Sequence, residues 1–209
     1  MPEDESKAHA EQQRAYFDQR TFVFTQPIPP AVQERTRKIV EAARLDSQAR
    51  VLDVATGIGV LVPHILSQGV RPENIMGCDL SPKMLDEARR RYPDVPFWQG
   101  DFLDFPHEFG PFDAIFFNAC FGNFYDQGRV LQKAAALLSS DGRLLISHPM
   151  GARFVAQLRA AEPEIVPHCL PGRQALLEWA TGLGLILDAF VEEADLYIAV
   201  LRRGQVAQS

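Results

Sequence analysis

Side chains that accept hydrogen bonds stand at or just after the ends of successive apolar runs that are predicted to be strands. Asp53 lies in the run that begins at Val51, and Asp79 ends a second run 26 residues later. Asp101 and Asn118 follow the next two runs. Ligands bind beyond the carboxyl ends of strands in open parallel sheets. Each residue alone has another explanation as a turn or capping residue, but their convergence favours a site for an adenosine-containing ligand.

A glycine turn follows the first of these runs. Gly57 and Gly59 have no Cβ, so they permit positive φ angles and let a ligand approach the backbone closely. Asp79 stands where an acceptor can bind a ribose diol. A dinucleotide site calls for a complete G-x-G-x-x-G, but Ala55 occupies the first glycine position and apolar residues surround the third. An NAD-dependent oxidoreductase is therefore the weaker reading of this turn.

The elements that must position these residues alternate between strand and helix, which predicts a parallel sheet covered on both faces. Strands are predicted at residues 50–55, 74–79, 95–99, 112–118, 143–148, 185–192 and 196–202. Helices are predicted at residues 31–45, 60–68, 82–92, 127–138, 153–161 and 173–182. We expect a single domain over residues 1–209, with a disordered tail at 1–14, an N-terminal arm at 15–30 and an insert at 150–171 that caps the acceptor.

Five ordered segments resemble the motifs of class I S-adenosylmethionine-dependent methyltransferases. They are Val51–Gly59, Met76–Arg90, Phe97–Pro106, Pro111–Cys120 and Leu137–Ile146. The resemblance implies a Rossmann-like, doubly wound α/β fold. Its sheet is seven-stranded and mostly parallel, with helices on both faces and an antiparallel last strand. The cofactor it implies is S-adenosyl-L-methionine.

The resemblance also implies roles for individual residues around that cofactor. The turn would pack against the methionine part, Asp79 would bind the ribose, and Asp101 would accept from the adenine amino group. The cofactor-binding residues carried over in this way are Asp53, Ala55, Thr56, Gly57, Gly59, Asp79, Leu80, Met84, Asp101, Phe102 and Asn118. Ala55 replaces the more usual glycine, and we expect its methyl group to be tolerated.

Candidate catalytic residues come from outside these motifs, because a general base is needed only if the acceptor carries its proton. His148 ends a strand and precedes Pro149, which favours an extended backbone and a side chain directed to the crevice. A packed histidine is the alternative. His168 lies in a proline-rich loop, and Tyr125 belongs to an aromatic group that could wall an acceptor pocket. No H-x-x-x-H or C-x-x-C spacing supports a metal site.

Composition limits the partners of this 209-residue chain. Its net charge of −6 disfavours a nucleic-acid substrate, and no apolar run approaches the roughly 20 residues of a membrane span. Three cysteines without paired spacing indicate a reducing compartment, so we expect a cytoplasmic protein. We also expect a monomer or a homodimer. By resemblance, the segment Tyr16–Asp18 folds over the cofactor as a lid, with a loosely anchored arm as the alternative, and the acceptor is a small molecule. A cofactor-binding regulatory protein without turnover is the other alternative.

Overall fold

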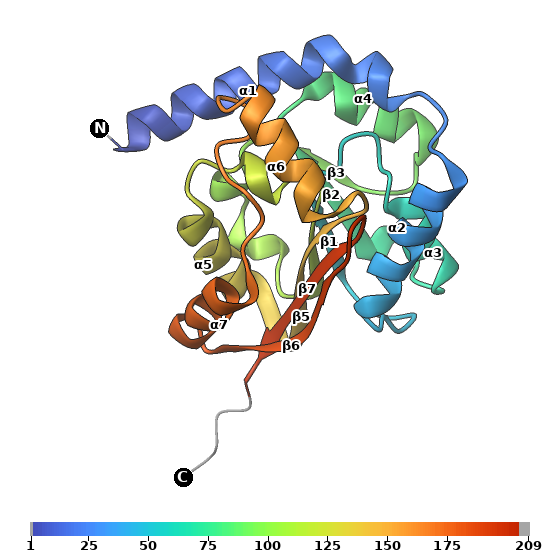
Figure 1. Ribbon diagram of the computed structural model, residues 1–209. Helices are drawn as coiled ribbons and strands as arrows, with labels where there is room; N and C mark the ends of the chain where they lie inside the picture. Colours follow the sequence, from blue (N-terminus) through green and yellow to red (C-terminus); the bar gives the residue numbers. More distant parts are fainter. Residues whose placement is uncertain (1, 205–209) are drawn as a thin grey trace.

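The computed structural model describes residues 2–204 and contains one seven-stranded sheet (Figure 1). The strands are β1 Val51–Val54, β2 Ile75–Asp79, β3 Phe97–Gln99, β4 Phe112–Asn118, β5 Leu138–His148, β6 Leu185–Glu192 and β7 Tyr197–Arg203. Their order is β3-β2-β1-β4-β5-β7-β6, with β7 antiparallel to both of its neighbours and the pairs from β3 to β5 parallel. The predicted fold class, including the antiparallel last strand, is confirmed.

Seven α-helices and four short 3-10 helices surround this sheet in the described part of the chain. The α-helices are α1 Pro2–Phe24, α2 Pro30–Ala42, α3 Val62–Ser67, α4 Pro82–Arg91, α5 Gln127–Leu137, α6 Gly151–Ala161 and α7 Arg173–Gly182. The 3-10 helices are η1 Pro72–Asn74, η2 Phe102–Asp104, η3 His107–Phe109 and η4 Phe121–Asn123.

Alternation along the central strands produces two apolar cores, one on each face of the sheet. Val51 and Phe116 belong to the core that includes residues of α2 and α3, whereas Leu52 and Phe117 belong to the core that includes residues of α5 and α7. Successive side chains of a strand point to opposite faces. Strands buried on both faces therefore read as the continuous apolar runs seen in the sequence.

The strand order reverses at β1, which pairs with β2 on one side and with β4 on the other. Chain connections leave in opposite directions at such a point, and a crevice opens beyond the carboxyl ends of the strands. Asp53, Asp79 and Asn118 all belong to these three strands. The fold thus brings the polar residues singled out in the sequence to one edge of the sheet.

The N-terminal segment differs from the expectation of a disordered tail and a separate arm. Residues 2–24 form the single helix α1, which runs alongside α4 over one end of the sheet (Figure 1). Its sequence favours a helix, because Pro2 precedes acidic residues at positions 3–5 and strong helix formers such as alanine, glutamine and arginine follow. The prediction for residues 2–14 was therefore wrong, and residue 1 lies outside the described residues.

A smaller difference concerns β5, which begins at Leu138 instead of Arg143. Leu138 pairs with Phe112, and the register then shifts before Arg143 pairs with Ala114. Asp141 and Gly142 therefore lie inside an irregular part of the strand. The carboxyl end of β5 is at His148, as expected.

Candidate active site

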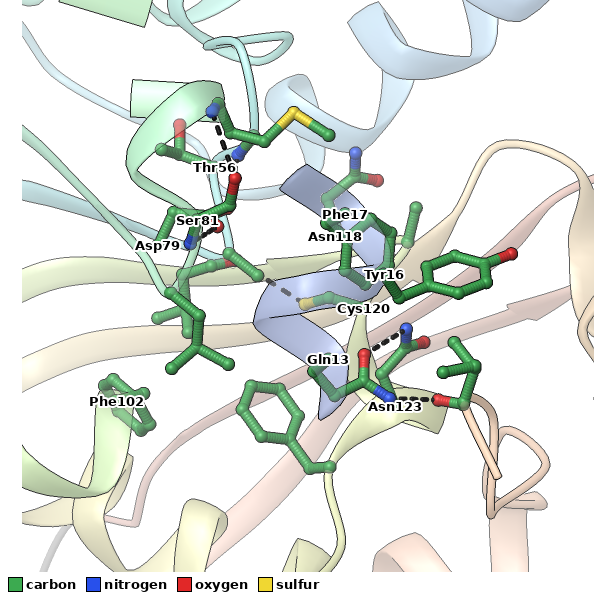
Figure 2. A pocket seen from close by; sticks show the side chains of 18 of the residues that line it. Gln13, Tyr16, Phe17, Thr56, Asp79, Ser81, Phe102, Asn118, Cys120 and Asn123 are labelled. Atoms are coloured by element: carbon green, nitrogen blue, oxygen red, sulfur yellow. Dashed lines mark hydrogen bonds between the residues drawn. The ribbon is translucent and has the colours of Figure 1, made fainter. Parts of the chain in front are cut away.

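A cavity of about 670 Å³ lies between α1 and the carboxyl ends of β1, β2, β4 and β5. Its lining includes every cofactor-binding candidate from the sequence except Gly59. Figure 2 shows Gln13, Tyr16 and Phe17 of α1 in the same space as Asp79, Asn118 and Cys120 from the sheet side. A cavity of this size is in the usual range for small-molecule and cofactor sites, roughly 300–1,000 Å³.

Asp79 is held in place by backbone groups on both sides. Its Oδ2 atom accepts a hydrogen bond from the Gly57 amide at 2.8 Å, and its Oδ1 atom accepts one from the Ser81 amide at 2.9 Å. Burial raises the pKa of Asp79 to about 6, although these backbone hydrogen bonds oppose the shift. Each carboxylate oxygen keeps a further lone pair. Asp79 can therefore accept hydrogen bonds from two neighbouring hydroxyl groups without losing its own support.

Asp53 is a second carboxylate at the sheet edge and, unlike the half-buried Asp79, it is buried. The Thr56 hydroxyl donates to Asp53 Oδ2 at 2.6 Å, and the Thr56 amide donates to the carbonyl of Cys78 on the neighbouring strand. Burial is the main cause that raises the pKa of Asp53 to about 7, and the nearby charge of Asp79 adds to it. A cationic group bound in the cavity would lower the pKa of Asp53, because an opposite charge favours the ionised carboxylate.

The turn between β1 and α3 has the conformation that its glycines predict. Gly57 and Gly59 have φ angles of +55° and +82°. A Cβ on Gly59 would lie 2.8 Å from the Tyr92 ring, whereas one on Gly57 would meet no atom within 4 Å. Gly59 is thus required by packing and Gly57 leaves open space beside the cavity. Ala55 also has a positive φ of +54°, so this residue carries strain at the cavity wall.

The adenine-side candidates from the sequence also reach the cavity. Asp101 Oδ1 accepts from the Leu103 amide at 2.9 Å and so caps η2, while its Oδ2 atom has no partner among the described residues. Phe102, Leu80 and Met84 line the same region. Asn118 lies at the end of β4, where its Oδ1 atom accepts from the Ser147 hydroxyl at 3.0 Å. Asp101 can therefore accept a further hydrogen bond from a ligand.

Helix α1 forms the roof of the cavity and supplies residues that the sequence analysis did not select. Gln13, 4% exposed, donates to the carbonyl of Ile165 at 2.5 Å and accepts from the Asn123 side chain at 3.3 Å. The Ser81 hydroxyl donates to Asp18 at 2.5 Å and also accepts from the Met84 amide. These contacts fasten α1 at two points, to the segments around η4 and Ile165 and to the start of α4.

The three catalytic candidates lie in different environments. His148 is buried and lines the cavity. Tyr125 lines its outer part, 40% exposed, with its hydroxyl donating to Glu5 of α1 at 2.6 Å. His168 is not among the lining residues, and its ring donates to the Tyr125 carbonyl at 3.0 Å. The structure therefore brings His148 and Tyr125 to the cavity and leaves His168 outside it.

Two further findings bear on the expected partners. Among the side chains described for residues 5–204, no group of three or more His, Cys, Asp or Glu lies close enough together to hold a metal ion. None of the described helices has the length and apolar character needed to cross a membrane.

Residues 51–142 match the family model described as "Methyltransferase domain". These residues run from β1 into β5 and contain the glycine turn, Asp79 and Asp101. This part of the chain therefore has the sequence pattern of a methyltransferase domain. The magnesium protoporphyrin IX methyltransferase of Synechocystis, which is 16% identical and has a TM-score of 0.68, was solved with S-adenosylmethionine bound.

Curated relatives support the same assignment of the methyltransferase domain. A demethylmenaquinone methyltransferase of Thermotoga maritima is 37% identical over 58% of this chain and 54% of that protein. A trans-aconitate 2-methyltransferase of Methylobacterium nodulans is 29% identical over 78% of this chain and 80% of that protein. The chain spans about half the length of the demethylmenaquinone methyltransferases it matches.

Solved structures show the fold of the methyltransferase domain over nearly the whole chain. The magnesium protoporphyrin IX methyltransferase of Synechocystis, solved with S-adenosylhomocysteine, has a TM-score of 0.70 at 15% identity and covers 94% of this chain and 100% of its own. The 1,6-didemethyltoxoflavin-N1-methyltransferase of Burkholderia thailandensis has a TM-score of 0.70 at 19% identity, covering 96% and 91%. At these identities the likeness establishes the fold alone.

Proposed function

We propose that this protein transfers a methyl group from S-adenosylmethionine to a small-molecule acceptor. The observation that carries the proposal is Asp79, which is fixed by two backbone amides beside the open backbone of Gly57 in a cavity of about 670 Å³. This arrangement suits a ribose diol next to a backbone that a ligand can approach closely. The buried carboxylate of Asp53 suits the cationic end of the same cofactor.

When bound, S-adenosylmethionine supplies an electrophilic methyl group, and transfer leaves S-adenosylhomocysteine and the methylated acceptor. The chain's own residues have the task of positioning and of excluding water. Helix α1 covers the cavity, and Phe154, Ile165 and Val166 add apolar walls on the side of the 150–171 insert. Orientation of two reactants can supply about 7–11 kcal/mol of a barrier.

We further propose that α1 is a lid and that the 150–171 insert borders the acceptor. Both supply lining residues, and the Gln13 contact with the Ile165 carbonyl joins them. This buried hydrogen bond holds α1 against the insert. Ligand exchange would then require α1 to move. Cytoplasmic location, the absence of nucleic-acid binding and a monomeric or dimeric state stay predictions from the sequence.

Calorimetry with S-adenosylhomocysteine tests the proposed cofactor site. Replacing Asp79 by Asn puts a donor N–H group opposite the donor amide of either Gly57 or Ser81. We therefore expect the affinity for S-adenosylhomocysteine to fall at least about tenfold. Asp94→Asn, at an exposed acid outside the cavity, is the matched control and should bind like the wild type. Thermal melts of both variants separate lost binding from lost folding.

The same titration separates the alternatives left open by the sequence. Heat with NADH and none with S-adenosylhomocysteine would support an oxidoreductase and contradict the proposal. A regulatory protein would bind S-adenosylhomocysteine but transfer no methyl group from S-adenosylmethionine to any of a panel of phenols, thiols, amines and carboxylic acids.

A further inference from the structure

His148 is a buried polar residue of the cavity that the cofactor motifs do not include. It ends β5, is 6% exposed and lines the cavity next to Phe154, with the two ring centroids 5.4 Å apart. It was expected from the sequence to be the best candidate for a general base. Its hydrogen bonds point to a different chemical role.

The backbone fixes the tautomer of this histidine. The Met150 amide donates a hydrogen bond to His148 Nδ1 at 3.1 Å. A backbone amide can only donate, so Nδ1 must be the unprotonated nitrogen and Nε2 carries the proton of the neutral ring. Burial lowers the pKa of His148 to about 4, so the ring is neutral near pH 7. In this form Nε2 has no lone pair with which to take a proton from an acceptor.

The turn after β5 is held firmly enough to maintain this contact. Arg35 of α2 donates to the Pro149 carbonyl at 2.6 Å and also contacts Asp195. Gly151 has a φ of +76°, and a Cβ there would lie 2.8 Å from the Ala194 carbonyl oxygen. The direction of the Met150 amide is therefore set by long-range packing of the turn.

The Nε2–H group of His148 is a free donor directed to the cavity. It has no hydrogen-bond partner among the side chains described for residues 5–204, although every fully buried side-chain nitrogen or oxygen described there has one. Nε2 must therefore border open space, and His148 lines the cavity. A buried donor without a partner is costly, and a ligand oxygen would remove that cost.

We propose that His148 Nε2–H donates a hydrogen bond to an oxygen of the methyl acceptor. The acceptor class is then a molecule with a phenolate, enolate or carbonyl oxygen, whose apolar part faces the walls formed by Phe154, Ile165 and Val166. This inference rests on the proposed methyltransferase function. An ammonium or neutral amine N–H at the same place would put a donor against a donor, so amines are the disfavoured class.

Two substitutions separate a donor from a base. His148→Asn keeps an oxygen that can accept from the Met150 amide but has no N–H group at the Nε2 position. His148→Gln places an N–H group near the Nε2 position. The probe is 4-nitrophenol, titrated into protein saturated with S-adenosylhomocysteine. Nitrobenzene, which keeps the ring and the nitro group but lacks the phenol oxygen, is the matched control.

We expect the wild type to bind 4-nitrophenol about tenfold tighter than nitrobenzene, the Gln variant to keep most of this preference and the Asn variant to lose it. A wild type without the preference, or an Asn variant that retains it, would overturn the inference. A Gln variant that loses the preference while folding like the wild type would overturn it too.

Nitrogen-15 NMR of histidine-labelled protein gives a readout that needs no acceptor. His148, assigned by its absence in the variants, should show a protonated Nε2 and an unprotonated Nδ1 from about pH 5.5 to 8. A ring protonated at Nδ1, or one that becomes cationic in this range, contradicts the inference. Absence of S-adenosylhomocysteine binding by the wild type would instead reject the underlying function.

Discussion

At the scale of single residues, the buried Asp53 and the half-buried Asp79 are two carboxylates with raised pKa values. The pKa of Asp53 is raised to about 7 and that of Asp79 to about 6, in both cases chiefly by burial. The folded ligand-free protein therefore holds protons that the unfolded chain releases near pH 4. A cationic ligand favours the ionised carboxylates instead. The stability of the ligand-free protein should therefore depend on pH.

The stability of the ligand-free protein should fall as pH rises. A raised carboxyl pKa contributes its full stabilisation below the unfolded value of 3.8, and the contribution is lost as pH rises through the folded value of about 7. Chemical unfolding at pH 5, 6, 7 and 8 should show this decline. Asp53→Asn should remove much of it, whereas Asp94→Asn should not. An unchanged slope in Asp53→Asn would contradict the role of Asp53.

Gly57 offers a second test at this scale, because a matched glycine lies far along the chain. Gly57 and Gly184 have φ angles of +55° and +65°, and a Cβ on either meets no atom within 4 Å. Replacing each by Ala should cost a similar free energy of unfolding, about 1–2 kcal/mol.

The two variants should differ in binding, because Gly57 borders the cavity and Gly184 joins α7 to β6. We expect Gly57→Ala alone to weaken S-adenosylhomocysteine binding, by about tenfold or more. Calorimetry on both variants checks this. Equal binding by the two variants would show that the ligand does not approach the Gly57 backbone.

At the scale of elements, α1 connects the two halves of the cavity wall. Its contacts with distant segments include hydrogen bonds of Gln13 and Asp18 and the packing of Tyr16 against the core that includes residues of α5 and α7. A helix held by a few polar contacts over a cavity can open at lower cost than a helix packed on the core.

Gln13→Ala should loosen α1. It leaves the Ile165 carbonyl and the Asn123 amide without this partner, which costs about 1–3 kcal/mol. Faster hydrogen exchange in α1 and faster S-adenosylhomocysteine release should follow.

Gln12→Ala is the control for this lid prediction, since Gln12 makes one exposed contact with Glu164 at 3.1 Å. It should change stability by no more than about 0.5 kcal/mol. If Gln13→Ala and Gln12→Ala release the ligand at the same rate, then α1 does not act as the lid.

At the scale of the whole molecule, the sheet and its binding edge could be predicted from the sequence, but the roof could not. Val51 and Phe116 lie in strands that are buried on both faces. Such strands can be recognised in the sequence as continuous apolar runs. Helix α1 instead faces a cavity, so its inner residues include His9 and Gln13 and give no apolar stripe.

The role of His148 was also beyond the sequence. Its position at a strand end followed from the pattern of the run before Pro149. Its tautomer depends on the Met150 amide, whose direction is set by Arg35 more than a hundred residues away. Local sequence carries no signal for such a contact, whereas the glycine turn at Gly57 is wholly local.

A crystal structure of the complex with S-adenosylhomocysteine tests the central claim most directly. The account predicts both ribose hydroxyls within about 3.2 Å of the Asp79 carboxylate, with the ligand passing over Gly57 beneath α1. A ligand whose ribose lies away from Asp79, or one bound outside this cavity, would contradict it.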